Sequence, residues 1–221
     1  MKVTLAVLLV LVTVLAARIF LFPPADNSAG KPVEGLPWQI KVLPDGNSKV
    51  SGLTLGVDTL ADARARFGRD VQVAVVAAPG EIGNAEAFFY GVTFGAVAGK
   101  LVVTADIPPD KIKSMRQRAA KVEYMESSTK KWTLTPDDKA AAYAAPIRTL
   151  TFIPAINLDE QIVLQRFGKP AERIRSSDHI EHFLYPDRGL DLILDDDGKE
   201  VLQYVPPKRF AELRTPLMAK Q

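Results

Sequence analysis

Two stretches of the chain, GLTLGVDTLADARARFGRD at 52–70 and FIPAINLDEQIVLQRFGKP at 152–170, share one local pattern. Each begins with an apolar stretch typical of a strand, passes a residue that can cap a helix, and ends in Arg-Phe-Gly. The predicted caps are Asp58 in the first copy and Asn157 or Asp159 in the second. Glycine commonly follows the last turn of a helix. The pattern therefore predicts two short helices that open two copies of one structural unit.

The residues expected on the buried faces of these helices are apolar and recur at helical spacing. They are Leu60, Ala63 and Phe67 in the first copy and Val163, Leu164 and Phe167 in the second.

Alternating apolar stretches after each helix predict antiparallel strands. In the second copy these are Ala171–Arg175, Ile180–Tyr185, Leu190–Leu194 and Glu200–Val205, and in the first copy Val71–Val76, Ala87–Val92 and Lys100–Ala105. The turn from Asp195 to Gly198 ends in Asp-Gly, which predicts a tight hairpin with positive φ at the glycine. Gly91, Gly95 and Gly99 have the spacing of a membrane-helix interface, but their aromatic and β-branched neighbours favour strand breaks and turns.

Between the copies, residues 108–127 read as a helix with Pro109 at its first position. Its expected apolar stripe is Ile112, Met115, Ala119, Val122 and Met125. A strand near Lys131–Leu134, a helix at Asp137–Ala144 and a strand at Ile147–Phe152 follow. The predicted class is α+β, with antiparallel sheets that are each covered by helices on one face.

This organisation resembles the SmpA/OmlA outer-membrane lipoprotein module, and its tandem form resembles the β-lactamase-inhibitor-protein fold. Gly56 to Gly68 and Ile156 to Pro170 match the family pattern, in which a short helix closes with Leu or Phe, Gly, any residue and Pro. The first copy lacks the closing Pro, and the chain has no cysteine to accept a lipid. The resemblance implies two α+β units and assigns no functional residue.

Composition limits the function classes. Hydrophobic residues make up 47% and charged residues 24% of the chain, as in a globular protein. A formal net charge of +2 gives no indication of nucleic-acid binding. The absence of cysteine excludes disulfides, thiolate metal sites and thiol redox motifs.

The N-terminal segment predicts a membrane anchor. Val3 to Phe22 is apolar except for Arg18, and at about 1.5 Å per residue it spans about 30 Å as a helix. Lys2 favours a cytoplasmic N-terminus, which places the rest of the chain in the periplasm. The alternative is a signal peptide cleaved after Ala16, with release into the periplasm.

The predicted organisation has six parts. They are an anchor or signal segment at 1–22, a tether at 23–37, the first repeat at 38–107, a connecting segment at 108–146, the second repeat at 147–210 and a tail at 211–221.

The two histidines lie in Ser-Asp-His-Ile-Glu-His, residues 177–182. Together with Asp178 and Glu181 they suggest zinc, but His179 and His182 point to opposite faces of a strand. We expect a polar, solvent-facing hairpin there. Asp195 to Asp197 lack the alternating ligands of a calcium loop. No phosphate loop, nucleophile elbow or Cys–His pair occurs, so we assign no catalytic, cofactor or metal residue.

These observations predict a non-catalytic interaction or scaffold module of the bacterial cell envelope, whose partner is another envelope protein. One alternative is a metal-dependent or hydrolytic enzyme around His179, Glu181 and His182. The other is a module that binds a small ligand or lipid on the concave face of its sheets. Convergence of the two imidazoles with carboxylates in a pocket would favour the enzyme.

The anchor can be tested directly. Alkaline phosphatase fused after Gln221 is expected to be active, because that end of the chain lies in the periplasm. N-terminal sequencing of the protein from membranes is expected to return Met1 or Lys2. A mature chain that begins at Ala17 and appears in the soluble periplasmic extract would establish the cleaved form instead.

Overall fold

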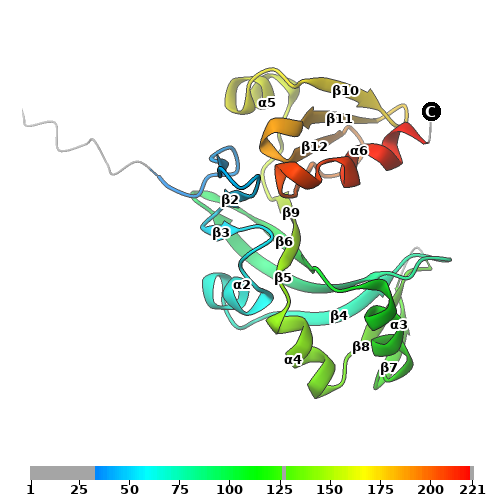
Figure 1. Cartoon of the computed structure of the whole chain (residues 1–221). Coiled ribbons are helices and arrows are strands. Elements are labelled where there is room, and N and C mark those ends of the chain that lie inside the picture. Colours follow the sequence, from blue (N-terminus) through cyan, green and yellow to red (C-terminus); the bar gives the residue numbers. More distant parts are fainter. Residues whose placement is uncertain (1–32, 126–127, 220–221) are drawn as a thin grey trace, which may run out of the picture. The chain divides into compact units, whose positions relative to one another are not determined.

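The computed structural model describes residues 33–125 and 128–219 of the chain. From Glu34 onward the chain forms one compact unit (Figure 1). The apolar run at 3–22 lies outside the described residues, so the anchor stays a prediction. No helix within the described ranges has both the length and the apolar character needed to cross a membrane.

A ten-stranded antiparallel sheet forms the framework of the unit, in the order β10-β11-β12-β13-β9-β6-β5-β4-β8-β7. Its strands are β4 Gln72–Ala77, β5 Asn84–Phe94, β6 Val97–Ala105, β7 Lys121–Tyr124, β8 Lys130–Thr133, β9 Ile147–Pro154, β10 Glu172–Arg175, β11 Ile180–Tyr185, β12 Leu190–Asp195 and β13 Val201–Tyr204. The predicted strands of both copies are therefore present. They belong to one sheet because β9 pairs with β6 on one side and with β13 on the other.

Five α-helices accompany this sheet in the described residues: α2 Leu60–Phe67, α3 Pro109–Gln117, α4 Pro136–Ala144, α5 Glu160–Phe167 and α6 Ala211–Met218. Two 3-10 turns occur, η1 Pro186–Arg188 and η2 Pro207–Arg209. The α+β class is confirmed.

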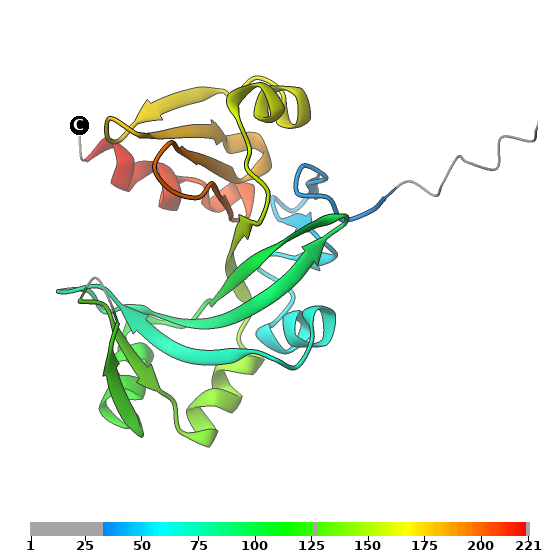
Figure 2. The ribbon, with the colours of Figure 1, turned by 180° about the vertical axis from the view of Figure 1, so that it is seen from behind.

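Two parts of the fold were not predicted. A small antiparallel sheet is made of β1 Lys41–Val42, β2 Ser48–Val50 and β3 Leu53–Thr54. The helix α6 occupies most of the segment expected as a tail, and it runs beside strands β10 to β13 (Figures 1 and 2).

The repeated helices have the expected ends, with one correction. The capping residue of α2 is Thr59 rather than Asp58, and its side chain accepts a hydrogen bond from the backbone N–H of Asp62. Asp58 instead accepts from the N–H of Thr54 at 2.6 Å. The cap of α5 is Asp159, one of the two residues predicted.

The buried faces of the two helices are close to those predicted. Phe167 is fully buried, and Phe67 is half-buried with its ring 5.6 Å from that of Phe94. Leu164 is 37% exposed, so its predicted burial is wrong. Val163 and Phe167, four residues apart, form the buried stripe of α5, and Leu164 follows one residue outside it.

The helix predicted at 108–127 ends at Gln117. Arg118 follows it, and its guanidinium lies 2.6 Å from the carboxylate of Asp138 in α4, which holds the chain in a turn. Residues 121–124 then pair with β8 as an edge strand. The apolar stripe therefore stops early, and Val122 and Met125 are exposed instead of buried.

The glycine-rich segment at 91–99 is a β-hairpin, so the interpretation as strand and turn positions is confirmed. Gly95 has φ 61° in the two-residue turn between Phe94 and Val97. The prediction for Gly198 is wrong, because this residue is not among those with positive φ. Instead, the side chain of Asp195 accepts a hydrogen bond from the N–H of Asp197, and its carbonyl accepts one from the N–H of Gly198.

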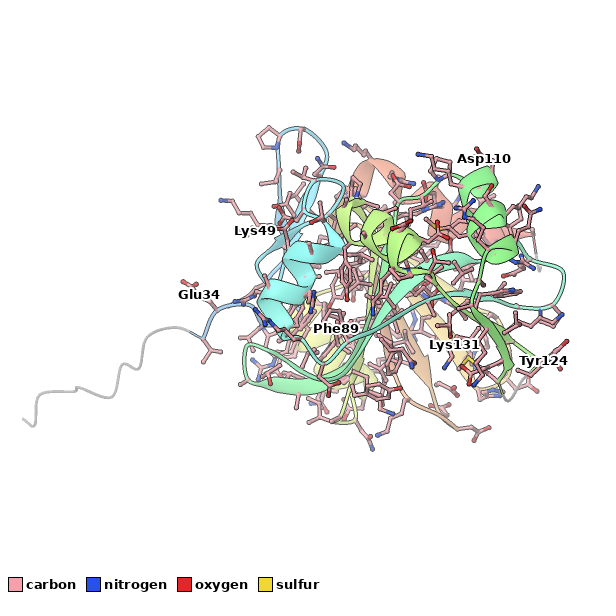
Figure 3. The ribbon with its side chains drawn as sticks, turned by 90° about the horizontal axis from the view of Figure 1, so that it is seen from below. Glu34, Lys49, Phe89, Asp110, Tyr124 and Lys131 are labelled. Carbon is pink, nitrogen blue, oxygen red and sulfur yellow. The ribbon has the colours of Figure 1, made fainter. Side chains whose placement is uncertain are left out.

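The two faces of the large sheet bury different apolar clusters. The main core contains residues from α2, α3, α4 and α5 on one face of the sheet. It also contains strand residues, such as the fully buried Phe89 of β5 (Figure 3). A second cluster contains Ile174, Leu184, Val205 and Phe210, with residues of α6 packed against it. Because Phe183 belongs to the first cluster and Leu184 to the second, the two clusters lie on opposite faces.

We expect Phe167→Ala to destabilise the protein by about 3–5 kcal/mol, because it removes a fully buried ring and leaves a cavity. Leu164→Ala, in the same helix but on the exposed side, is the matched control and is expected to change the free energy of unfolding by less than about 1 kcal/mol. Urea denaturation of both variants measures the difference. Equal losses of stability would contradict the orientation of α5.

Candidate functional site

The face of the sheet that lies opposite the main core is only partly covered, and we call it the open face. Along β5, Ala85, Ala87 and Phe89 are buried in the core, whereas the alternate residues Phe88 and Tyr90 point to the other side. Strand pairing continues this side across the sheet, from Phe88 to Val102 of β6 and Thr151 of β9, and then to Gln203 of β13. The apolar residues of α6 pack against the part formed by β10 and β11 and the end of β13.

A hollow of about 650 Å³ lies on the open face beside the β5–β6 hairpin. We call it the hairpin hollow. Its lining comes from β5, β6, the end of β9 and Lys199: Tyr90, Gly91, Val92, Thr93, Ala98, Gly99, Lys100, Ile153, Pro154, Ala155 and Lys199.

Local sequence accounts for the hairpin hollow. The register of β5 against β6 shifts between Phe89 and Val92, which is a β-bulge. Gly91 lies in this bulge, and a Cβ added there would meet no atom within 4 Å. Tyr90 is 59% exposed, and its ring packs edge-on against Phe88 at 4.7 Å. The bulge therefore presents a large aromatic side chain beside an empty space.

Glu86 lies further along the same side of β5, opposite Thr104. Its side chain makes no hydrogen bond or ion pair with the residues that the structure describes. Burial raises its pKa to about 7. Near neutral pH this carboxyl is therefore protonated in about half of the molecules, which reduces the negative charge on the open face.

The two histidines of the predicted hairpin do not converge. His179 precedes β11 and is exposed, with its ring nitrogens 3.8 Å from Asp197 and 4.0 Å from Asp195. His182 is 7% exposed and contacts Asp191. The expectation of a solvent-facing hairpin is therefore wrong for His182.

The acidic residues of the hairpin do not join the histidines either. Glu181 pairs with Arg173 at 2.9 Å. Within residues 33–125 and 128–219, no group of three or more His, Cys, Asp or Glu side chains is placed to hold a metal ion.

His182 is the centre of a polar relay. Its Nδ1 lies 2.9 Å from Oδ2 of Asp191, and its Nε2 lies 3.1 Å from Oγ of Ser176. Burial raises the pKa of Asp191, and the hydrogen bond from His182 opposes that rise. With the proton on Nδ1, the imidazole donates to Asp191 and accepts from the hydroxyl of Ser176 at Nε2. This is the order of contacts in which a histidine activates a serine.

Ser176 and Asp191 were not predicted as members of a site. Asp191 is 2% exposed in Gly-Leu-Asp-Leu, where a charged residue interrupts a buried apolar strand. That interruption is the only signal, because the contact with His182 depends on the register of β11 against β12.

A second hollow, of about 410 Å³, lies where α5 begins and β12 ends. We call it the acidic hollow. It is lined by Asn157, Leu158, Asp159, Glu160, Arg175, His179, Ile180, Glu181, Leu194, Asp195, Asp196, Gly198 and Glu200. Lys199 connects the two hollows, since it lines the hairpin hollow and donates a hydrogen bond at 2.7 Å to Asn157 of the acidic hollow.

Comparison of the chain with protein-family models, with curated proteins and with solved structures found no match to any of them.

Proposed function

We propose that this chain is a non-catalytic protein-interaction module of the bacterial cell envelope, tethered to the inner membrane by its N-terminal segment. It binds its partner through the hairpin hollow and the open face around it. The observation that carries the proposal is Tyr90, a large aromatic residue 59% exposed at the edge of a 650 Å³ hollow.

Tyrosine is among the residues that dominate binding energy when a partner covers them, because its ring buries a large area and loses little conformational entropy. Tyr90 is also held in place, since its ring packs against Phe88. A fixed aromatic residue beside an empty hollow is suited to receive an apolar group of another protein.

The charges around the hairpin hollow define the partner further. Lys100 and Lys199 line it, and no carboxylate does. The partner therefore presents an apolar group next to acidic residues, which pair with the two ammonium groups. This chemistry fits an envelope protein with an acidic surface.

A photo-reactive benzoylphenylalanine at position 90 is expected to give one discrete protein adduct in intact cells. Tyr124, an exposed tyrosine on the edge strand β7 (Figure 3), is the matched control position and is expected to give none. The adduct is detected by a shift in electrophoretic mobility and identified by mass spectrometry.

Gly91→Trp completes this test. Its side chain enters open space and its backbone φ is not positive, so the fold is retained while the hollow is filled. We expect the adduct at position 90 to disappear in this variant. An adduct that persists, or that forms equally at position 124, would contradict the hairpin hollow as the binding site. A lipid or small molecule in place of a protein adduct would favour a ligand-binding module.

A hydrolytic function is the second candidate, and the Ser176–His182–Asp191 relay favours it. Ser176 is exposed, whereas the two residues behind it are buried. Oγ of Ser176 would bond to the carbonyl carbon of an ester while its proton passes to Nε2 of His182. The leaving alkoxide takes up that proton, and water then releases the acid by the same steps.

Two backbone N–H groups that follow Ser176 in the sequence are candidate donors to the developing oxyanion. The backbone N–H groups of Ser177 and Asp178 have no acceptor in the described part of the chain. Free N–H groups of this kind stabilise the oxyanion of acyl transfer when they point at it.

A fluorophosphonate probe distinguishes the two functions. If the relay activates Ser176, the probe labels it, and Ser176→Ala abolishes the label. Asp191→Asn slows labelling because the imidazole loses its orienting carboxylate. Ser177→Ala is the control and keeps the label, since it retains the backbone N–H. Absence of labelling in the unchanged protein would leave the relay as a structural network and favour the interaction module.

A further inference from the structure

The acidic hollow contains more carboxylates than its neighbouring cations can pair. Six carboxylates line it, from Asp159, Glu160, Glu181, Asp195, Asp196 and Glu200. The lining also includes Arg175, and His179 as a titratable group. The excess of negative charge within one concave surface favours a cationic ligand.

Four of these carboxylates already have partners. Asp195 accepts a hydrogen bond at 3.1 Å from the N–H of Asp197. Asp159 accepts a hydrogen bond at 2.7 Å from the N–H of Ile162 and so caps α5. Glu160 and Glu181 share the guanidinium of Arg173, at 2.7 and 2.9 Å. These residues form part of the wall of the hollow, and their side chains are held by the partners named above.

Glu200 differs from them, because it is 8% exposed and makes no hydrogen bond or ion pair with any described residue. Its Oε2 atom is buried without a donor. A carboxylate that leaves water without gaining a partner is strongly unfavourable, so buried carboxylates are generally paired with a donor or a cation. Glu200 is therefore an unsatisfied acceptor in the wall of the hollow.

The size of the hollow indicates the size of the cation. A metal ion needs several ligands within about 2.0–2.6 Å of one point, and the described residues provide no such group of three. A volume of about 410 Å³ instead accommodates a planar guanidinium with part of its alkyl chain. An alkylguanidinium has five N–H donors, so it can give two parallel hydrogen bonds to one carboxylate and still donate to a second, which suits Glu200 together with the exposed Asp196.

We propose that the acidic hollow receives an arginine side chain of the protein that binds the hairpin hollow. The inference rests on the proposed interaction function and specifies a second contact of the same partner. Lys199 supports this continuity, because it lines one hollow and is hydrogen-bonded to the wall of the other. The partner then presents an apolar group flanked by acidic residues to one hollow and an arginine to the other.

Binding of butylguanidinium to the purified full-length chain, in a non-ionic detergent, tests the site without the partner. Chemical-shift changes in NMR titrations are expected to saturate and to map to the acidic hollow. Glu200→Gln keeps the shape of the side chain and removes its charge, and it is expected to weaken binding about tenfold. Asp187→Asn removes an exposed charge from the same half of the sheet, outside the hollow, and is expected to have no effect.

Asp196→Asn provides a second variant on the surface, in case the substitution at Glu200 disturbs folding, and it is expected to weaken binding as well. Butylammonium is expected to bind more weakly than butylguanidinium, since it lacks the planar pair of donors. Titrations that do not saturate, or equal affinities of the unchanged protein and both variants, would overturn the site. Saturable binding without any cross-link at position 90 would retain the cation site and reject the shared partner.

Discussion

The fold depends on the double pairing of β9. Phe152 in this strand lies opposite Leu101 of β6 and opposite Leu202 of β13, and its ring stacks on Phe94 at 4.3 Å. Because side chains alternate strictly along paired strands, this one strand fixes which residues of both halves share a face. Two units that each resemble a helix followed by a meander are thereby joined into one sheet with one common core. A shift of β9 by one residue would expose Phe152 and move Thr151 into that core.

The same constraint explains why an uncovered surface remains on the other side. The helices α2 to α5 bury their apolar residues in the main core. Among the helices of the described residues, only α6 packs on the opposite face, and its cluster with Phe210 contains Ile174, Leu184 and Val205. The middle of the open face is therefore left to β5, β6 and β9. A bulge with Gly91 then opens the hairpin hollow at the end of this uncovered region.

Local patterns predicted the strands well, since β11 occupies the predicted Ile180–Tyr185. Both repeated helices also end at the predicted Phe-Gly, although the cap of the first is Thr59 and not Asp58. The errors arise where tertiary contacts decide. The helical spacing of apolar residues across 108–127 continues past Gln117, which predicted a longer helix. The helix ends there instead, and the next residue, Arg118, forms an ion pair with Asp138 of α4. The burial of His182 depends on Asp191, a residue on a neighbouring strand that no spacing in the sequence connects to it. The two hollows were not predicted either. Their walls come from several strands, and the hydrophobic periodicity of a sequence does not specify which strands pair with each other.

The positions of the charges support the proposed interaction function over the hydrolytic alternative. A hydrolase needs its nucleophile beside a hollow that holds the substrate, and Ser176 lines neither of the two hollows. Those hollows instead have complementary linings, one with two lysines and one with six carboxylates, and Lys199 joins them. A surface with lysines in one hollow and carboxylates in the other discriminates between partners by orientation, because a reversed partner would bring like charges together.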